Sequence, residues 1–214
     1  MGVGKTIQAL AVSSVYVKDW PLLIICPKSL KLTWRDEIKR WLPDYAEEIN
    51  LISNGKGTVN NDKKIHICSY EIATKLSHQF LKRGIGVAIC DEAHYLKSNN
   101  SKRSQSLVPI LTRMKRLMLL SGTPMLARPV ELFNSLKMLR PDIFNDFFEY
   151  VNRYCDPKEG PYGADYSGAA HTKELHYILE DKIMIRRLKK NVLSELPPKL
   201  RQKIVVTTDS KIVR

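Results

Sequence analysis

The sequence predicts an α/β fold in which a mostly parallel sheet carries helices on both faces. Short, continuous apolar runs alternate along the chain with longer segments whose apolar residues recur every three or four positions. The runs lack the polar–apolar alternation of a half-exposed strand, as expected for strands buried on both faces. Regular alternation of strands and helices is typical of a doubly wound layer structure.

Four apolar runs, each bounded by Pro, Gly or polar residues, are the predicted strands of this sheet. They are LLIICP (22–27), KIHICSY (64–70), GVAICDE (86–92) and RLMLLSGTP (116–124). One further strand, RQKIVVTT (201–208), is expected after the break at PPK.

The segments between the runs have helical spacing. They are GKTIQALAVSSVYV (4–17), SLKLTWRDEIKRWL (29–42), EIATKLSHQFLKR (71–83), RSQSLVPILTRM (103–114) and PVELFNSLKML (129–139). In the second of these, Trp34 and Trp41 are seven residues apart and are expected to mark the core side of one helix.

The order weakens after residue 140. Residues 142–155 are aromatic and helical in pattern, whereas 156–170 are rich in Gly, Pro and Asp and predict a loop. Residues 172–196 are helical in part and strongly basic around RRLKK. That basic run is expected to be a solvated helix face, with one of Arg186 and Arg187 buried after the apolar IMI.

The composition indicates a globular, strongly basic protein. The 214 residues are 43% apolar and 27% charged, enough for one domain with a substantial core. Lys and Arg total 35 and Asp and Glu 22, giving a net charge of +13 that suits a polyanion such as nucleic acid. Scattered surface lysines would explain the same charge.

The sequence contains no apolar run of membrane-spanning length, and its opening lacks the basic-then-apolar pattern of a signal peptide. Three of the four cysteines, Cys26, Cys68 and Cys90, lie in or beside the apolar runs and are predicted to be buried strand residues. A disulfide framework is therefore not expected. The five histidines show no metal-ligand spacing, so a zinc site is not expected either.

The opening MGVGKT contains most of a phosphate-binding loop, whose full pattern is G-x-x-x-x-G-K-[ST]. Gly2, Val3 and Gly4 would bring backbone N–H groups against phosphate oxygens, and Lys5 would reach the β- and γ-phosphates. Thr6 would offer its hydroxyl to Mg²⁺, and the helix that starts here would add its positive end. The alternative is a glycine turn with an incidental lysine.

Two more polar motifs follow apolar runs. In VAICDEAH, Asp91 occupies the strand-end position of a Mg²⁺-binding carboxylate, and Glu92 would orient the attacking water. An acidic helix start is the alternative for this pair. Ser121, Gly122 and Thr123 follow the next run, and ligands of open α/β sheets bind where strands end. A small P-loop kinase would share only the first motif.

Taken together, GVGKT, DEAH and SGTP resemble the first RecA-like lobe of superfamily-two helicases. ICPKSLKLTWRDEIKRWLP, ICSYE and IMIRRLKKNVLSELPPK are similar to motifs of the Swi/Snf class of DNA-translocating ATPases. WPLLIICP, RPVELFNSL, RYCDPK and DYSGAA most resemble the HARP annealing-helicase branch. The resemblance implies a RecA-like P-loop NTPase fold across nearly the whole chain.

The resemblance also implies ATP and Mg²⁺ as cofactors, double-stranded or forked DNA as partner, and a nuclear location. Lys5, Asp91 and Glu92 would be catalytic, Gly2 to Thr6 would bind ATP, and Thr6 and Asp91 would hold the metal. Ser121, Gly122 and Thr123 would couple the nucleotide to DNA grip. Lys28, Ser29 and Ser69 would lie near the DNA backbone. Translocation would rewind single strands and remodel replication forks.

Against the family pattern, the chain is expected to be incomplete at its N-terminus and to lack the second RecA-like lobe with its arginine fingers. The expected divisions are 1–140 for the ATP-binding core, 141–205 for a helical and loop extension, and 206–214 for a linker. The 214 residues alone are then expected to be a weak or inactive ATPase. The alternatives are a non-catalytic DNA-binding fragment and a chromatin-remodelling ATPase of the same class.

Overall fold

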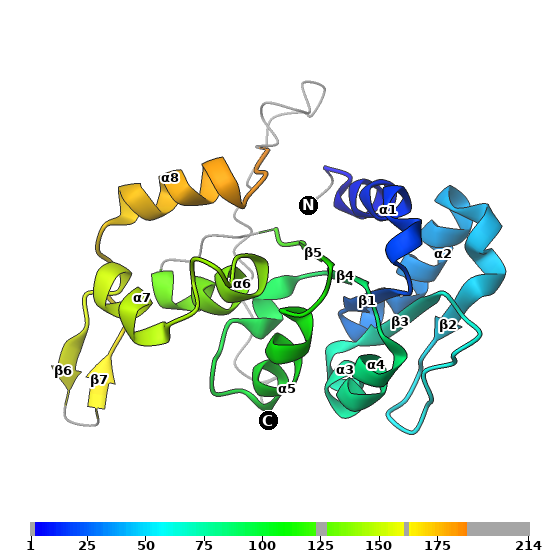
Figure 1. Ribbon diagram of the computed structural model, residues 1–214, viewed down its shortest axis with the longest axis horizontal. Coiled ribbons are helices and arrows are strands. Elements are labelled where there is room, and N and C mark those ends of the chain that lie inside the picture. The colour runs from blue at the N-terminus through cyan, green and yellow to red at the C-terminus, as the bar shows by residue number, and fades with distance from the viewer. Residues whose placement is uncertain (1–2, 123–127, 161–162, 188–214) are drawn as a thin grey trace, which may run out of the picture.

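A five-stranded, all-parallel sheet forms the centre of the protein (Figure 1). The computed structural model describes residues 3–122, 128–160 and 163–187. The strand order is β2-β3-β1-β4-β5. The bounds are β1 Leu22–Cys26, β2 Ile49–Leu51, β3 Ile65–Ser69, β4 Val87–Cys90 and β5 Arg116–Leu119. The four strands predicted in this part of the chain are confirmed, and the short β2 is an addition at one side of the sheet.

Helices cover both faces of the sheet, as predicted. Leu23 and Ile25 of β1 join a core cluster with α3, α4 and α5, whereas Leu22 and Ile24 join a second cluster with α1 and α2. The two clusters alternate along one strand because successive side chains point to opposite faces. The helices are α1 Lys5–Val15, α2 Lys31–Trp41, α3 Tyr70–Lys75, α4 Ser77–Arg83, α5 Lys102–Leu111, α6 Phe133–Leu139, α7 Phe147–Tyr154 and α8 Thr172–Lys182.

Residues 71–83, predicted as one helix, form two. Leu76, at φ −100° and ψ 12°, separates α3 from α4. Its side chain is buried in the core, and its backbone carbonyl accepts the N–H of Gln79. The periodicity alone did not reveal this break because apolar spacing continues across it.

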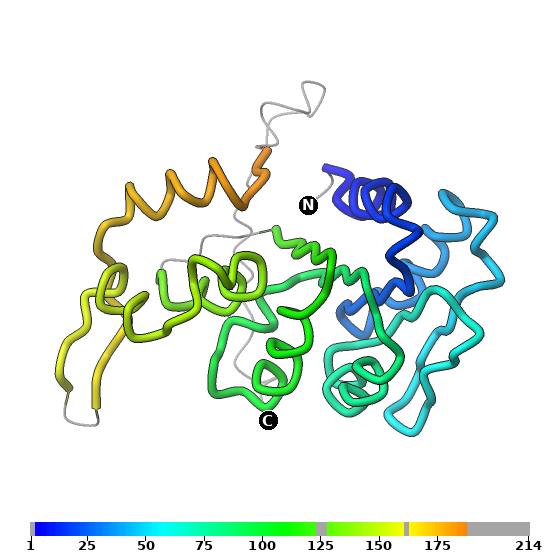
Figure 2. Tube along the Cα trace, in the orientation of Figure 1, coloured from blue at the N-terminus to red at the C-terminus, as the bar shows by residue number. Residues whose placement is uncertain are grey.

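The part of the chain beyond α6 forms a core of its own at one end of the molecule. Phe133 and Leu136 of α6 pack there with residues of α7 and α8. Figure 2 shows this part of the chain, coloured from green to orange, at one end of the molecule. The predicted loop 156–170 contains an antiparallel pair, β6 Lys158–Gly160 and β7 Gly163–Asp165, where Gly163 takes a φ of +114°. This hairpin was missed because its strands are three residues long and carry no apolar run.

The tryptophans of α2 differ from the prediction. Trp34 is 1% exposed and packs against the sheet, but Trp41 is 44% exposed and donates a hydrogen bond to Glu37. Trp41 is the last residue of α2, where its ring lies at the surface beside Glu37 and Arg40. The heptad spacing therefore placed only one of the two rings correctly.

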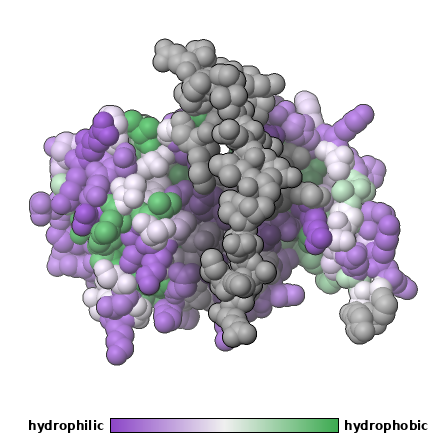
Figure 3. Space-filling view, turned by 180° about the vertical axis from the view of Figure 1, so that it is seen from behind, coloured by the Kyte–Doolittle hydropathy of each residue, from purple (hydrophilic) through white to green (hydrophobic). Residues whose placement is uncertain are grey.

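Burial of the strands falls at β5. Every residue of β1, β3 and β4 is buried, whereas Leu117, Met118 and Leu119 of β5 are half-buried. Within the described residues, β5 pairs only with β4. On the face seen in Figure 3, hydrophilic side chains dominate the two ends of the molecule and apolar patches are small.

All four cysteines are buried and free, which confirms the prediction for Cys26, Cys68 and Cys90. Arg186 and Arg187 are both exposed, so the expected burial of one of them is wrong. No helix in the described part of the chain is long and apolar enough to cross a bilayer. Residues 201–208, Lys189, Lys190 and the linker 206–214 lie outside the described residues, and the three-part division remains a prediction.

Candidate functional site

The candidate site lies at the carboxyl edge of the sheet, the edge where all five parallel strands end. Cys26 pairs with Ser69, and Cys90 pairs with Ile25 and Leu119, so the ends of β1, β3, β4 and β5 are nearly level. The residues predicted to act lie at or just after these ends: Lys28, Ser29, Ser69, Asp91, Glu92, Ser121 and Gly122. Gly2 and Thr123 lie outside the described residues.

Asp91 is held from several sides. Its backbone N–H donates to the Ile25 carbonyl at 2.8 Å, which continues the β4–β1 ladder by one residue. Its carboxylate accepts the Trp34 indole N–H at 2.9 Å and the Glu92 backbone N–H at 3.0 Å. Only 7% of the Asp91 surface is exposed, so this residue is buried at the carboxyl edge of the sheet.

The charge of Asp91 affects the pKa of two neighbouring cysteines. Burial, and then the Asp91 carboxylate, raise the pKa of the Cys26 thiol to about 12. Burial and the same carboxylate also raise the pKa of Cys90. Both thiols are therefore protonated at neutral pH and act as small apolar residues beside the candidate metal ligand.

Glu92 has a left-handed backbone, with φ 51° and ψ 53°. This region is unfavourable for a residue with a Cβ, and such strain concentrates at functional sites. The turn ends β4 and directs the chain into η4 (Ala93–Leu96), and the Glu92 carboxylate lies 3.1 Å from His94 Nδ1. The conformation is a local feature that the sequence motif did not reveal.

The phosphate-binding segment enters α1 through another left-handed residue. Gly4 has φ 74° and ψ 28°, and a Cβ there would lie 3.3 Å from the Ile7 side chain. Among the described residues no side chain caps the start of α1, and the first turn of the helix holds no acidic residue. A left-handed residue followed by free helical N–H groups suits an anion, so this segment fits a phosphate.

A cavity of about 420 Å³ joins this segment to the carboxyl edge. Its lining includes Lys5 and Gln8 of α1, Ala93 and His94 after β4, and Ser121 after β5. The half-buried residues of β5 and apolar residues of α6 and α8 form its other walls. Thr6, Asp91 and Glu92, although described, lie outside this lining.

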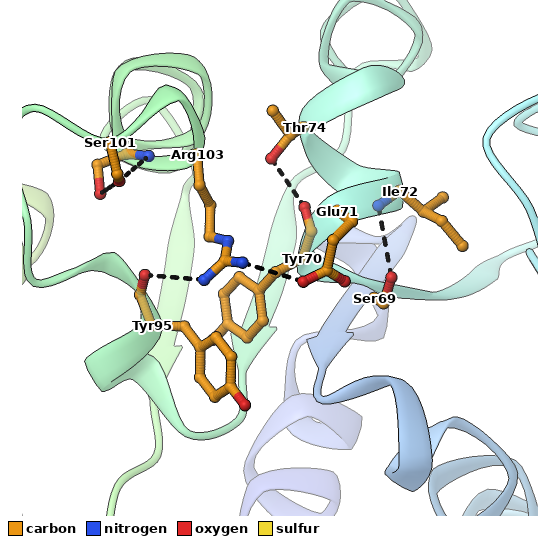
Figure 4. Close-up of polar contacts among 9 residues, drawn as sticks. Ser69, Tyr70, Glu71, Ile72, Thr74, Tyr95, Ser101 and Arg103 are labelled. Carbon is orange, nitrogen blue, oxygen red and sulfur yellow. Dashed lines mark hydrogen bonds and ion pairs between the residues drawn. The ribbon is translucent and has the colours of Figure 1, made fainter.

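The predicted DNA-facing residues differ in exposure. Lys28 and Ser29 are exposed in the turn η2 (Lys28–Leu30) that leads into α2. Ser69 is 2% exposed, and its hydroxyl accepts the Ile72 N–H at the start of α3 (Figure 4). Hydrogen bonds from the Glu71 backbone and the Ser69 side chain, together with the charges of Arg103 and Lys28, hold the pKa of Glu71 below its usual value.

Beside Ser69 lies a cluster that the sequence analysis missed. The rings of Tyr70 and Tyr95 stack with centroids 5.1 Å apart, and Arg103 lies over both (Figure 4). Arg103 donates to the Glu71 carboxylate at 3.0 Å and to the Tyr95 carbonyl at 3.3 Å. Tyr70 directly follows ICS and Tyr95 directly follows DEAH, so the two aromatic residues could be seen in the sequence. The stacking of their rings was not evident from it.

Comparison with known proteins gives the family. The sequence matches the SNF2-related domain over residues 1–212. The chain belongs to the SNF2-related domain family. Family membership implies that the chain uses a nucleotide.

Two groups of relatives are similar along nearly the whole chain. The Xenopus tropicalis SWI/SNF-related matrix-associated actin-dependent regulator of chromatin subfamily A-like protein 1 is 42% identical over 210 residues, 98% of this chain and 22% of that protein. The Homo sapiens DNA annealing helicase and endonuclease ZRANB3 is 42% identical over 214 residues, 95% of this chain and 20% of that protein. The chain thus spans about a fifth of the length of these relatives.

Solved structures confirm the fold. The Sulfolobus solfataricus SWI2/SNF2 ATPase core in complex with double-stranded DNA superposes with a TM-score of 0.70 at 23% identity, covering 92% of this chain and 41% of that one. The Pyrococcus furiosus Hef helicase domain gives a TM-score of 0.50 at 16% identity, covering 65% of this chain and 31% of that one. The RecA-like α/β fold with a parallel sheet is therefore established for this chain.

Proposed function

We propose that this chain is the ATP-binding lobe of a DNA translocase of the annealing-helicase type, which rewinds DNA and remodels replication forks. The observation that carries the proposal is the gathering of Lys28, Asp91, Glu92 and Ser121 at one carboxyl edge of a family-matched fold. Relatives described as annealing helicases, at 42% identity, support the branch.

In this proposal the residues at the carboxyl edge divide the work on the nucleotide. The α1 start, with Gly4 and Lys5, binds the phosphates through backbone N–H groups and the ammonium. Thr6 and Asp91 would hold Mg²⁺, which neutralises charge on phosphate oxygens when bound. Glu92 orients the attacking water and takes its proton. Ser121, Gly122 and Thr123 link the nucleotide to DNA grip.

Asp91 suits a cation ligand on chemical grounds. Each carboxylate oxygen accepts one hydrogen bond from the protein, which leaves a lone pair on each for a further ligand. Carboxylate and hydroxyl oxygens are the donors that Mg²⁺ prefers. The donor chemistry of Asp91 and of the Thr6 hydroxyl therefore suits the ion.

Duplex or forked DNA is the proposed partner, held by its phosphates. The +13 charge favours a polyanion, and the related solved core is a complex with double-stranded DNA. Lys28 and Ser29 are exposed and free to face a backbone, whereas the buried Ser69 contributes by shaping the start of α3. The remaining parts of the proposal are a second RecA-like lobe as partner and action in the nucleus.

The test is nucleotide binding by the 214-residue chain with Mg²⁺. Replacing Lys5 by Ala should weaken the affinity for ATP at least tenfold, because charge-assisted hydrogen bonds of about 1.5–3 kcal/mol are lost. Lys18→Ala is the matched control, since Lys18 is exposed and precedes β1 at the opposite edge of the sheet. Equal affinities for the wild type and Lys5→Ala would contradict the proposal.

Two alternatives remain testable in the same preparation. The basic charge also fits a DNA-binding module without turnover, and the chromatin-regulator names among the relatives fit a remodelling ATPase of the same class. DNA binding without any nucleotide affinity would favour the first. In a longer protein that carries this lobe and a second one, nucleosome sliding without strand annealing would favour the second.

A further inference from the structure

The buried indole of Trp34 is bonded to the proposed metal ligand. Trp34 Nε1 donates to Asp91 Oδ2 at 2.9 Å, across 57 residues of sequence. Trp34 is 1% exposed and Asp91 7%, so water does not compete strongly for this bond. Because Asp91 Oδ1 accepts the Glu92 N–H, the two bonds together fix the rotation of the carboxylate.

A second buried aromatic residue holds the same position from another element. Tyr70 is 1% exposed, and its hydroxyl donates to the Asp91 carbonyl oxygen at 2.8 Å. The Tyr70 and Tyr95 rings are stacked with 7° between their planes. Figure 4 shows Arg103 beside the stacked rings. Trp34 therefore fixes the carboxylate and Tyr70 fixes the backbone of one residue.

Both aromatic residues follow closely in the sequence after segments at the carboxyl edge. Trp34 lies on α2, which begins directly after the exposed turn of Lys28 and Ser29. Tyr70 directly follows Ser69 and is the first residue of α3. A movement of the Lys28–Ser29 turn would reach Asp91 through the first turn of α2 and the Trp34 hydrogen bond. A movement at Ser69 would reach Asp91 through the adjacent Tyr70 and its hydroxyl bond.

We propose that Trp34 and Tyr70 are positioning residues that hold Asp91 in its metal-binding orientation and link it to the two segments proposed to face DNA. This inference rests on the proposed function of Asp91. Packing alone does not require the indole N–H or the phenol O–H, and a buried N–H or O–H group is costly unless it has a partner. Groups that orient a metal ligand typically change metal affinity or activity by about 10–100-fold when removed.

The variants Trp34→Phe and Tyr70→Phe remove one hydrogen bond each and keep most of the ring packing. Trp41→Phe is the matched control, because Trp41 lies on the same helix, is 44% exposed, and donates to Glu37. Thermal unfolding of each variant tests whether the fold is retained. All measurements use the whole 214-residue chain.

The first readout is the indole N–H resonance of Trp34 in a ¹H–¹⁵N spectrum, assigned with the Trp→Phe variants of the three tryptophans. Asp91→Asn should move this resonance to higher field, since an amide oxygen is a weaker acceptor than a carboxylate. The Trp41 resonance should stay in place. If the chemical shift of the Trp34 indole N–H is the same in Asp91→Asn as in the wild type, the inference is wrong.

The second readout is the ratio of ATP affinities with and without Mg²⁺. Trp34→Phe should lower this ratio about tenfold and leave metal-free binding unchanged, with a smaller loss for Tyr70→Phe. Trp41→Phe should keep the wild-type ratio. If Trp34→Phe keeps it too, Trp34 does not orient the metal ligand and the inference is wrong; an unchanged ratio in Tyr70→Phe would remove Tyr70 in the same way.

The two proposals fail in different ways. A wild-type chain that binds no nucleotide, or binds it regardless of Lys5→Ala, contradicts the proposed function and removes the metal-orienting role with it. Magnesium-dependent binding that is identical in Trp34→Phe contradicts only the inference.

A third measurement tests the link to DNA. Duplex DNA should shift the Trp34 indole resonance in the wild-type chain, and the shift should shrink in Lys28→Ala. A Trp34 resonance that is unchanged while DNA is bound would overturn the link.

Discussion

Glu92 combines a strained backbone with a proposed catalytic carboxylate, so stability and activity should separate at this residue. Its φ of 51° costs a residue with a Cβ about 1–2 kcal/mol, which glycine does not incur. Glu92→Gly should therefore raise the free energy of unfolding by up to about 1 kcal/mol, after loss of the His94 contact, and abolish hydrolysis. Urea denaturation and an ATPase assay measure the two effects.

Two variants serve as controls for Glu92→Gly. Glu92→Gln should abolish hydrolysis without a gain in stability, because the Cβ remains. His171→Gly, at φ 46° before α8 and away from the carboxyl edge, should gain stability and keep nucleotide binding. If Glu92→Gly is less stable than Glu92→Gln, the backbone strain is not a significant cost.

His66 should make stability depend on pH below neutrality. Burial, and then the charge of Arg83, lower the pKa of His66 to about 4 in the folded chain, against about 6.5 when unfolded. Between these values the unfolded chain binds the proton and the folded chain does not. Stability should therefore fall as pH drops from 6.5 toward 4, by at most about 3 kcal/mol.

Urea denaturation at pH 7 and pH 5 measures this loss. His66→Leu should reduce the difference between the two pH values, because the variant has no imidazole to protonate in the core. His78→Gln is the control, since His78 is exposed on α4. A difference that persists in His66→Leu would assign the pH dependence to other groups.

At the scale of elements, the sequence predicted well where strands are long and apolar. β1, β3 and β4 are fully buried runs of four or five residues, so hydrophobicity alone located them. The strands β2, β6 and β7 are only three residues long each. β2 forms by pairing with the distant β3, and β6 by pairing with β7, so the local sequence pattern does not reveal them. The break at Leu76 is likewise set by packing.

In the candidate site, too, some features could be predicted from the sequence and others could not. Asp91, Glu92 and Ser121 were predicted because each follows an apolar run and parallel strands end at one edge, Lys5 and Thr6 were predicted from the phosphate-loop motif, and Lys28, Ser29 and Ser69 from the family resemblance. The contacts that orient Asp91 were not predicted, because Trp34 and Tyr70 lie 57 and 21 residues from it. Seven-residue spacing assigned the tryptophans to packing, and nothing in the sequence indicated that the indole N–H has an acidic partner.

The entry into β4 depends on a glycine. A Cβ at Gly86 would lie 1.9 Å from the Asp19 carbonyl oxygen, in the backbone that leads to β1. Gly86→Ala should therefore shift two strand entries and lower the free energy of unfolding by about 3 kcal/mol. Gly84→Ala, at φ 70° with open space around it, should cost only about 1–2 kcal/mol. Denaturant titration gives the ranking, and the reverse order would show that the backbone at Asp19 moves freely.

The charge of the whole molecule should dominate its contact with DNA. Neutralising phosphates releases counterions, so affinity should fall steeply with salt and differ little between duplex sequences. Lys28→Ala should lower the slope of log K against log salt by roughly 0.9 if Lys28 meets one phosphate. Fluorescence anisotropy at several salt concentrations measures the slope, with Lys18→Ala as the control. A flat salt response in the wild-type chain would contradict electrostatic binding.

ATP hydrolysis should require more than this lobe. Among the described residues at the cavity, Lys97 is paired with Glu131 and His94 with Glu92, which leaves the transition-state charge largely to Lys5. Cations supplied by a facing element are worth about 10³–10⁵ in the rate of phosphoryl transfer. The 214-residue chain should therefore bind ATP but turn it over slowly, and a longer protein carrying a second RecA-like lobe should turn it over faster by a factor in that range. Steady-state hydrolysis with forked DNA compares the two, and Glu92→Gln in each separates true turnover from contamination. Equal rates that both disappear with Glu92→Gln would show that this lobe completes the reaction with its own residues.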